Sequence, residues 1–216
     1  MAETIAPGIE RVGSGGGGFG GEGFPGYDPD EGLPPGTARR VYHTGMWLAL
    51  VAVTMLFVAF TSAYIVRAGM SDDWSAIELP RLLWLNAAVL LVSSVTMEEA
   101  RRALYKGLRT ACNRWLAATT VAGFLFLGGQ FLVWRQLAAH GIYVASNPSS
   151  SFFYLLTGTH AIHLLGGLAA LLYADLEAWR FRLGPAKRTL VEVTAIYWHF
   201  MDGLWIFILL LLWFRR

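Results

Sequence analysis

Five long apolar stretches limit the fold of this chain of 216 residues more than any other feature of its sequence. They cover about residues 43–67, 81–104, 112–137, 152–176 and 190–214. Each is long enough to cross a bilayer, which takes about 20 predominantly apolar residues in a helix. Because the hydrocarbon core offers no water to backbone polar groups, a stretch of this kind crosses it as a helix. We therefore predict an all-α membrane protein, a bundle of five transmembrane helices.

The composition agrees with this class. Hydrophobic residues make up 55% of the chain and charged residues only 15%, whereas soluble globular chains carry roughly 25% charged residues. The single cysteine, Cys112, excludes an intrachain disulfide and a four-thiolate metal site. We expect no nucleic acid among the partners.

The N-terminal residues differ in character from the rest of the chain. They contain a run of glycines followed by PGYDPDEGLPPG, and such a segment cannot bury enough apolar surface to offset its ordering entropy. We predict a flexible Gly/Pro-rich arm over residues 1–37 and one transmembrane domain over residues 38–216. The arm is either an unstructured tail without a partner or a segment that orders along a neighbouring subunit.

The basic residues that flank the five stretches favour one orientation in the membrane. If the N-terminus is inside, eleven Lys and Arg residues flank the inner side and five flank the outer side. Short cytoplasmic loops carry an excess of such residues. The distribution predicts a cytoplasmic N-terminus and a C-terminus on the periplasmic, outer side.

Ionisable side chains interrupt the last two apolar stretches. Glu192, His199 and Asp202 lie in or at the edge of the fifth stretch, and His160 and His163 lie in the fourth. Glu192 and His199 are seven residues apart and therefore fall almost on one line of a helix. Charged groups at such depth usually face protein interior, water or a lipid head group rather than lipid tails.

These residues allow several interpretations. His160, His163 and His199 are of the type that binds metal or haem, but we favour histidines hydrogen-bonded within the bundle, because the chain has only five of them. A proton relay through His199 and Asp202 lacks a second carboxylate in the middle of the first four stretches. The favoured site is a seat for a zwitterionic phospholipid, whose ammonium would meet Glu192 and whose phosphate would meet the basic loop. That loop carries Arg180 and Arg182.

Four segments, taken together, resemble a known family. YWHFMDGLWIF at 197–207 is similar to the last helix of subunit III of the haem–copper oxidases, and FFYLLTGTHAIHLLGG at 152–167 is similar to another helix of that subunit. The segments beginning GMWLALVAV and LPRLLWLNA resemble two further helices. The resemblance runs from Tyr42 to Arg216 and leaves only the arm outside.

The resemblance implies a non-catalytic accessory subunit of a bacterial cytochrome c oxidase in the plasma (inner) membrane. Such a subunit packs on subunit I, binds phospholipid between its helices and supports sustained turnover and proton uptake, while haem and copper reside in partner subunits. A respiratory supercomplex is a further expected partner. No residue of this chain is expected to be catalytic or to bind metal. The implied lipid-binding set is Glu192, His199, His160, His163, Arg180 and Arg182, and the family-pattern residues are Trp198, Asp202, Trp205, Gly166 and Gly167.

Two departures from the family pattern stand out. Many members have seven helices where this chain has five, and Val53 occupies a position where members often carry an embedded glutamate. The alternatives left open are a subunit III of a quinol oxidase and a relative associated with nitric oxide reductase. From another class, a free-standing transporter or a haem-binding membrane protein remains possible.

Overall fold

The computed structural model describes residues 37–70, 80–180 and 185–214 of the chain. The arm predicted over residues 1–37 therefore lies outside the described residues, apart from Thr37, and its separation from a membrane domain stays a prediction. Within the described ranges the chain forms five helices and no strand. They are α1 (Thr37–Met70), α2 (Arg81–Tyr105), α3 (Arg109–Ala139), α4 (Pro148–Trp179) and α5 (Pro185–Phe214).

Each helix contains the apolar stretch predicted for it, and the helices begin up to six residues before those stretches. All five are long and apolar enough to cross a membrane. The prediction of an all-α, five-helix membrane bundle is confirmed, and the protein is a multi-pass membrane protein. The orientation of its termini stays a prediction.

Local signals explain where several helices begin and end. At the start of α4 the Asn147 side chain accepts a hydrogen bond from the Ser150 amide at 2.8 Å, and the Ser150 hydroxyl accepts one from the Asn147 amide at 3.1 Å. Pro148 occupies the first turn, where no amide hydrogen is needed. The ends of α2 and α3 are followed by Gly107 and Gly141, whose φ angles of 71° and 78° suit glycine.

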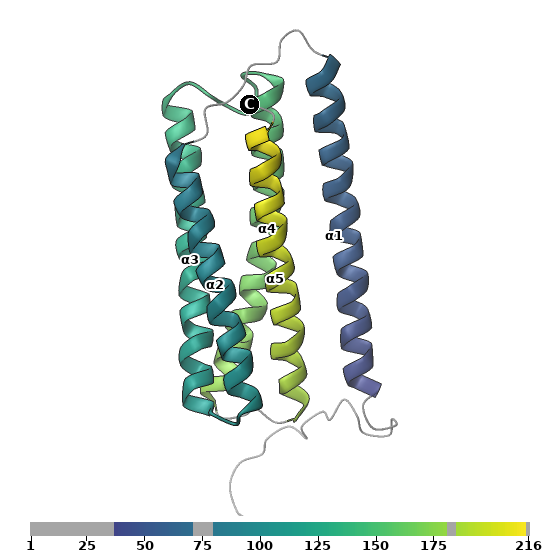
Figure 1. Cartoon of the computed structure of the whole chain (residues 1–216), viewed down its shortest axis with the longest axis vertical. Coiled ribbons are helices and arrows are strands. Elements are labelled where there is room, and N and C mark those ends of the chain that lie inside the picture. The colour runs from purple at the N-terminus through teal and green to yellow at the C-terminus, as the bar shows by residue number, and fades with distance from the viewer. Residues whose placement is uncertain (1–36, 71–79, 181–184, 215–216) are drawn as a thin grey trace, which may run out of the picture.

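The helices run side by side in alternating directions, with α1 at one side of the other four (Figure 1). In the part of the chain that the structure describes, α2, α3, α4 and α5 each contact the next and α5 contacts α2, so these four form a closed ring. Among the described elements, the first helix contacts only α4 and α5. As a result, the starts of α1, α3 and α5 share one end of the bundle with the ends of α2 and α4.

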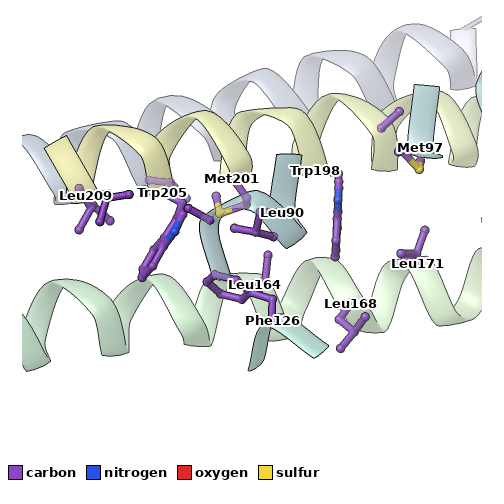
Figure 2. Packing of buried hydrophobic residues seen from close by; sticks show 14 of the residues in the cluster. Leu90, Met97, Phe126, Leu164, Leu168, Leu171, Trp198, Met201, Trp205 and Leu209 are labelled. Atoms are coloured by element: carbon purple, nitrogen blue, oxygen red, sulfur yellow. The ribbon is translucent and has the colours of Figure 1, made fainter. Parts of the chain in front are cut away.

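The core fills the ring of four helices and extends to α1 through Val53, Phe57 and Tyr64. Trp205 of α5 points toward Phe126 of α3 and Leu164 of α4, and Trp198 of α5 points toward Leu168 of α4 (Figure 2). Since lipid tails are as apolar as leucine, close packing rather than exclusion from water holds such helices together. The buried cluster therefore stabilises the bundle through close van der Waals packing between the helices.

Glycines allow the closest of these approaches. A Cβ atom added at Gly123 of α3 would lie 2.8 Å from the Trp198 ring, and one added at Gly129 would overlap the Asn86 side chain of α2. Asn86 is buried and donates to the Phe126 carbonyl oxygen at 3.0 Å. The glycines of α3 thus set its distance from α2 and α5.

Candidate functional site: the polar side of the last helix

Glu192 connects three helices at the end of the bundle where α5 begins. Its carboxylate Oε1 accepts a hydrogen bond from the Tyr105 hydroxyl of α2 at 2.5 Å. Its Oε2 lies 3.1 Å from Nη2 of Arg39 and 3.5 Å from Nε2 of His43, both on α1. Glu192 is only 8% exposed, so its charge is met mostly by these groups. The carboxylate therefore joins α1 to the four-helix ring.

His199 lies two turns further along α5 and faces α2. Its Nδ1 is 2.6 Å from the Ser94 hydroxyl, and its Nε2 is 4.0 Å from Oε2 of Glu98. Glu98 is itself held by Arg101 at 2.9 Å and Arg102 at 3.2 Å, both on its own helix. Glu192 and His199 thus lie along one polar side of α5, as their spacing predicted.

Two of the three tryptophans of α5, Trp198 and Trp205, point into the ring instead, as does Asp202. Trp198 is fully buried and donates from its indole nitrogen to the Ser93 hydroxyl at 3.0 Å. Trp205 packs edge-on against Phe126 with ring centroids 4.9 Å apart. Asp202 is 4% exposed, and neither carboxylate oxygen has a hydrogen-bond partner in the described part of the chain. Trp198 and Trp205 are core residues, and Asp202 is a buried acid between them along α5.

The two histidines of α4 face different neighbours. His160 is completely buried between Phe126 and Trp205, with ring centroids 5.9 and 5.0 Å away. His163 donates from Nδ1 to a carbonyl oxygen of its own helix at 2.8 Å, and its ring lies 5.9 Å from the Phe57 ring of α1. One histidine therefore belongs to the core and the other to the contact with α1.

The three membrane histidines do not converge on one point. His160 faces α3 and α5, His163 faces α1, and His199 faces α2. Among the residues that the structure describes, no group of three or more His, Cys, Asp or Glu side chains is placed to hold a metal ion. This geometry does not fit a metal or haem site built from the three.

Of the two arginines in the predicted lipid seat, the structure describes only Arg180. Arg180 follows the end of α4 and is exposed, and no hydrogen bond or ion pair joins it to Glu192 within the described ranges. Arg182 lies outside the described residues. The five predicted lipid-binding residues that the structure describes are thus spread over the polar side of α5, the core, the contact with α1 and the surface.

The glycine pair of α4 has unequal surroundings. A Cβ atom at Gly167 would lie 2.8 Å from a ring carbon of Tyr197, whereas one at Gly166 would meet nothing within 4 Å. Tyr197 also donates its hydroxyl to the His163 carbonyl oxygen at 2.9 Å. Gly167 is therefore needed for the contact between α4 and α5, and Gly166 is not needed for any contact among the described residues.

An apolar groove of about 350 Å³ runs between α1 and α5. It lies on the side of α5 that faces the first helix, which makes few other contacts with the ring. The residues that line it are Thr54, Phe57, Val58, Phe200, Gly203, Leu204 and Phe207. Its shape and apolar lining suit a hydrocarbon chain rather than a polar ligand.

Sequence reasoning did not find the partners of Glu192 and His199. Arg39 and His43 are four residues apart, as are Ser94 and Glu98, so each pair shares one side of its helix. That spacing was a usable signal for two polar helix faces. Nothing in the sequence indicated that both faces meet α5.

Together, the fold and this polar side define a multi-pass helical membrane protein in which buried ionisable residues mainly join helices to one another. The sequence profile described as cytochrome c oxidase subunit III matches residues 35–215. That match covers more than half of the chain, and the chain belongs to the cytochrome c oxidase subunit III family.

Curated relatives agree with this assignment. The chain is 34% identical over 178 residues to a probable cytochrome c oxidase subunit 3 of Mycobacterium tuberculosis, covering 80% of this chain and 86% of the relative. It is 31% identical over 175 residues to a cytochrome c oxidase subunit 3 of Synechocystis, covering 77% of this chain and 72% of the relative. It is also 31% identical over 166 residues to a cytochrome bo(3) ubiquinol oxidase subunit 3 of Pseudomonas aeruginosa, covering 75% of this chain and 79% of the relative. The recognition of an oxidase subunit III from its motifs is confirmed.

Proposed function

We propose that this chain is the non-catalytic subunit III of a proton-pumping terminal oxidase that passes electrons from cytochrome c to oxygen. The observation that carries the proposal is the family match over residues 35–215, together with relatives named cytochrome c oxidase subunit 3. The chain packs on the catalytic subunit I in a bacterial inner membrane. Haem and copper reside in the partner subunits.

The proposed contribution of the chain to the oxidase is structural support and phospholipid binding. It supports sustained turnover and proton uptake by holding the neighbouring subunit and by retaining phospholipid. The α1–α5 groove supports the lipid part, because its apolar lining would accept an acyl chain. Glu192 stands at the same end of these helices as the basic residues Arg39 and Arg180, where a head group would lie.

A quinol oxidase is the second candidate. The similarity to the Pseudomonas aeruginosa ubiquinol oxidase subunit favours it. The two candidates share the same role for this chain, since each relative is named as a subunit 3. They differ in the electron donor, which the catalytic partners determine.

Mild solubilisation of the native membrane, followed by purification through a tag on this chain, tests the assignment. We expect haem and copper absorbance in the purified complex, together with oxygen consumption supported by reduced cytochrome c. Oxygen consumption with quinol only would select the second candidate. Isolation of the chain by itself, or with a transport protein lacking haem, would refute both.

Removal of the chain from the purified complex tests its role. We expect the initial rate of oxygen reduction to be largely retained and the enzyme to lose activity within fewer turnovers. Equal durability with and without the chain would contradict the proposed role. Glu192→Gln in the intact complex is expected to lower the retention of a bound phospholipid in native mass spectrometry, and unchanged retention would count against Glu192 as part of the seat.

A further inference from the structure

Two adjoining hollows lie at the end of the bundle where α2 turns into α3. Their volumes are about 730 and 570 Å³, within the range of roughly 300–1,000 Å³ common for ligand pockets. Both are lined by Arg109, Thr110 and Arg114. The first also includes Trp115 and the second Trp179. These hollows are separate from the α1–α5 groove and from the polar side of α5.

The charge in the hollows is positive and unbalanced. Arg109 and Arg114 make no hydrogen bond or ion pair through their side chains in the described part of the chain, and none of the lining residues is acidic. The nearest acids in sequence, Glu98 and Glu99, are already paired with arginines of α2 at 2.9 Å. Two free guanidinium groups in one recess attract an anion such as a phosphodiester.

Polar side chains beside the arginines add hydrogen-bonding capacity. Thr110 offers a hydroxyl in both hollows. Asn113 lines the second hollow and donates its amide to the Ala178 carbonyl oxygen at 3.3 Å, while its own side-chain oxygen is buried without a partner among the described residues. The Asn113 bond thus holds the start of α3 against the end of α4 beside the second hollow.

The surroundings of the hollows are those of a membrane interface. Trp115 and Trp179 are 40% and 66% exposed at the end of the transmembrane helices, a level at which tryptophan is enriched. Further along α3, Val121 and Leu125 are 57% and 62% exposed, so an apolar surface continues from the basic hollows toward the middle of the membrane. A ligand with an anionic head and hydrocarbon tails matches this order of surfaces.

We propose that the two hollows bind the head group of an anionic phospholipid, such as phosphatidylglycerol. Arg109 and Arg114 hold the phosphodiester, and Thr110 donates to it. A zwitterionic head group is disfavoured, because its ammonium would meet two guanidinium groups and no carboxylate. This site is additional to the lipid seat near Glu192 and does not depend on it.

The test compares three forms of the complex purified through this chain: the unaltered protein, the double variant Arg109→Gln/Arg114→Gln, and the matched control Arg135→Gln. Arg135 is an exposed arginine at the opposite end of the same helix. Each is reconstituted in nanodiscs of phosphatidylcholine containing phosphatidylglycerol as one lipid in five, and retained lipids are identified by native mass spectrometry. Each arginine contributes to the binding of an anionic lipid. Without Arg109 and Arg114, the double variant should bind phosphatidylglycerol about tenfold to thirtyfold more weakly.

We expect retained phosphatidylglycerol in the unaltered protein and in Arg135→Gln, and its loss in the double variant. Equal retention in all three forms, or retention of phosphatidylcholine without preference, would overturn the proposal. A photo-crosslinking residue at Ala118 provides a second measurement: a lipid adduct supports the site, whereas an adduct with another polypeptide would show that a protein covers it. Both measurements read out on this chain even if it co-purifies with no oxidase, so the proposed function can fail independently.

Discussion

The contact between α2 and α3 can be tested with two neighbouring glycines. A Cβ atom at Gly129 would overlap the Asn86 side-chain oxygen, whereas a Cβ atom at Gly128 would meet nothing within 4 Å. Asn86 is 3% exposed and its amide is held by the Phe126 carbonyl oxygen at 3.0 Å. Gly129→Ala should therefore destabilise the bundle, and Gly128→Ala should not.

The magnitude follows from the two ways to relieve the overlap at Gly129. If Asn86 rotates, a buried amide loses its hydrogen bond, which costs about 1–3 kcal/mol. If the helices move apart, the overpacking costs about 1–3 kcal/mol. The gain in helix propensity from Gly to Ala is common to both variants, so the difference between them isolates the steric effect. That difference is expected to be about 1–3 kcal/mol, or roughly 2–12 °C in thermal stability.

The assay heats the complex in detergent and measures, by size-exclusion chromatography, the fraction that stays monodisperse at each temperature. The two glycine substitutions are also made in an Asn86→Ala background, because that change removes the overlapping atom. In that background the Gly129→Ala penalty should shrink, as coupled neighbours in a double-mutant cycle do. Equal stability of the two alanine variants, or the same penalty with and without Asn86, would refute the packing argument.

Three further outcomes are expected. Gly167→Ala should lower thermal stability by about 1–3 kcal/mol because of the Tyr197 ring, while Gly166→Ala should have no such effect; equal results would contradict the contact between α4 and α5. Glu192→Ala should weaken the attachment of α1 by about 0.5–1.5 kcal/mol, since it removes the charged acceptor of the contacts with Arg39 and His43; spin-label distances between α1 and α5 should broaden, and an unchanged distribution would refute the role. Asp202→Asn should leave thermal stability unchanged or raise it by up to about 2 kcal/mol, because the acid is buried without a partner in the described chain; a clear loss of stability would reveal a partner in another subunit.

The sequence by itself determined the number of helices, their approximate bounds and the family. The free energy of moving about 20 apolar residues into a bilayer is a local property of each stretch, so neighbouring helices are not needed to predict a span. The same holds for the family motifs, such as those around His199 and His160, which are read along the chain. The spacing of Glu192 and His199 also placed them correctly on one side of a helix.

Only the tertiary structure decided what each polar residue faces. Glu192 meets Arg39, which is 153 residues away, and Tyr105, which is 87 residues away. The three histidines of α4 and α5 face different helices. His160 faces α3 and α5, His163 faces α1, and His199 faces α2. Gly128 and Gly129 are adjacent, yet only one of them touches α2. In a membrane helix that is apolar on nearly every side, periodicity does not distinguish the lipid face from the packed face, and the rotation of each helix is fixed only by the side chains of its neighbours.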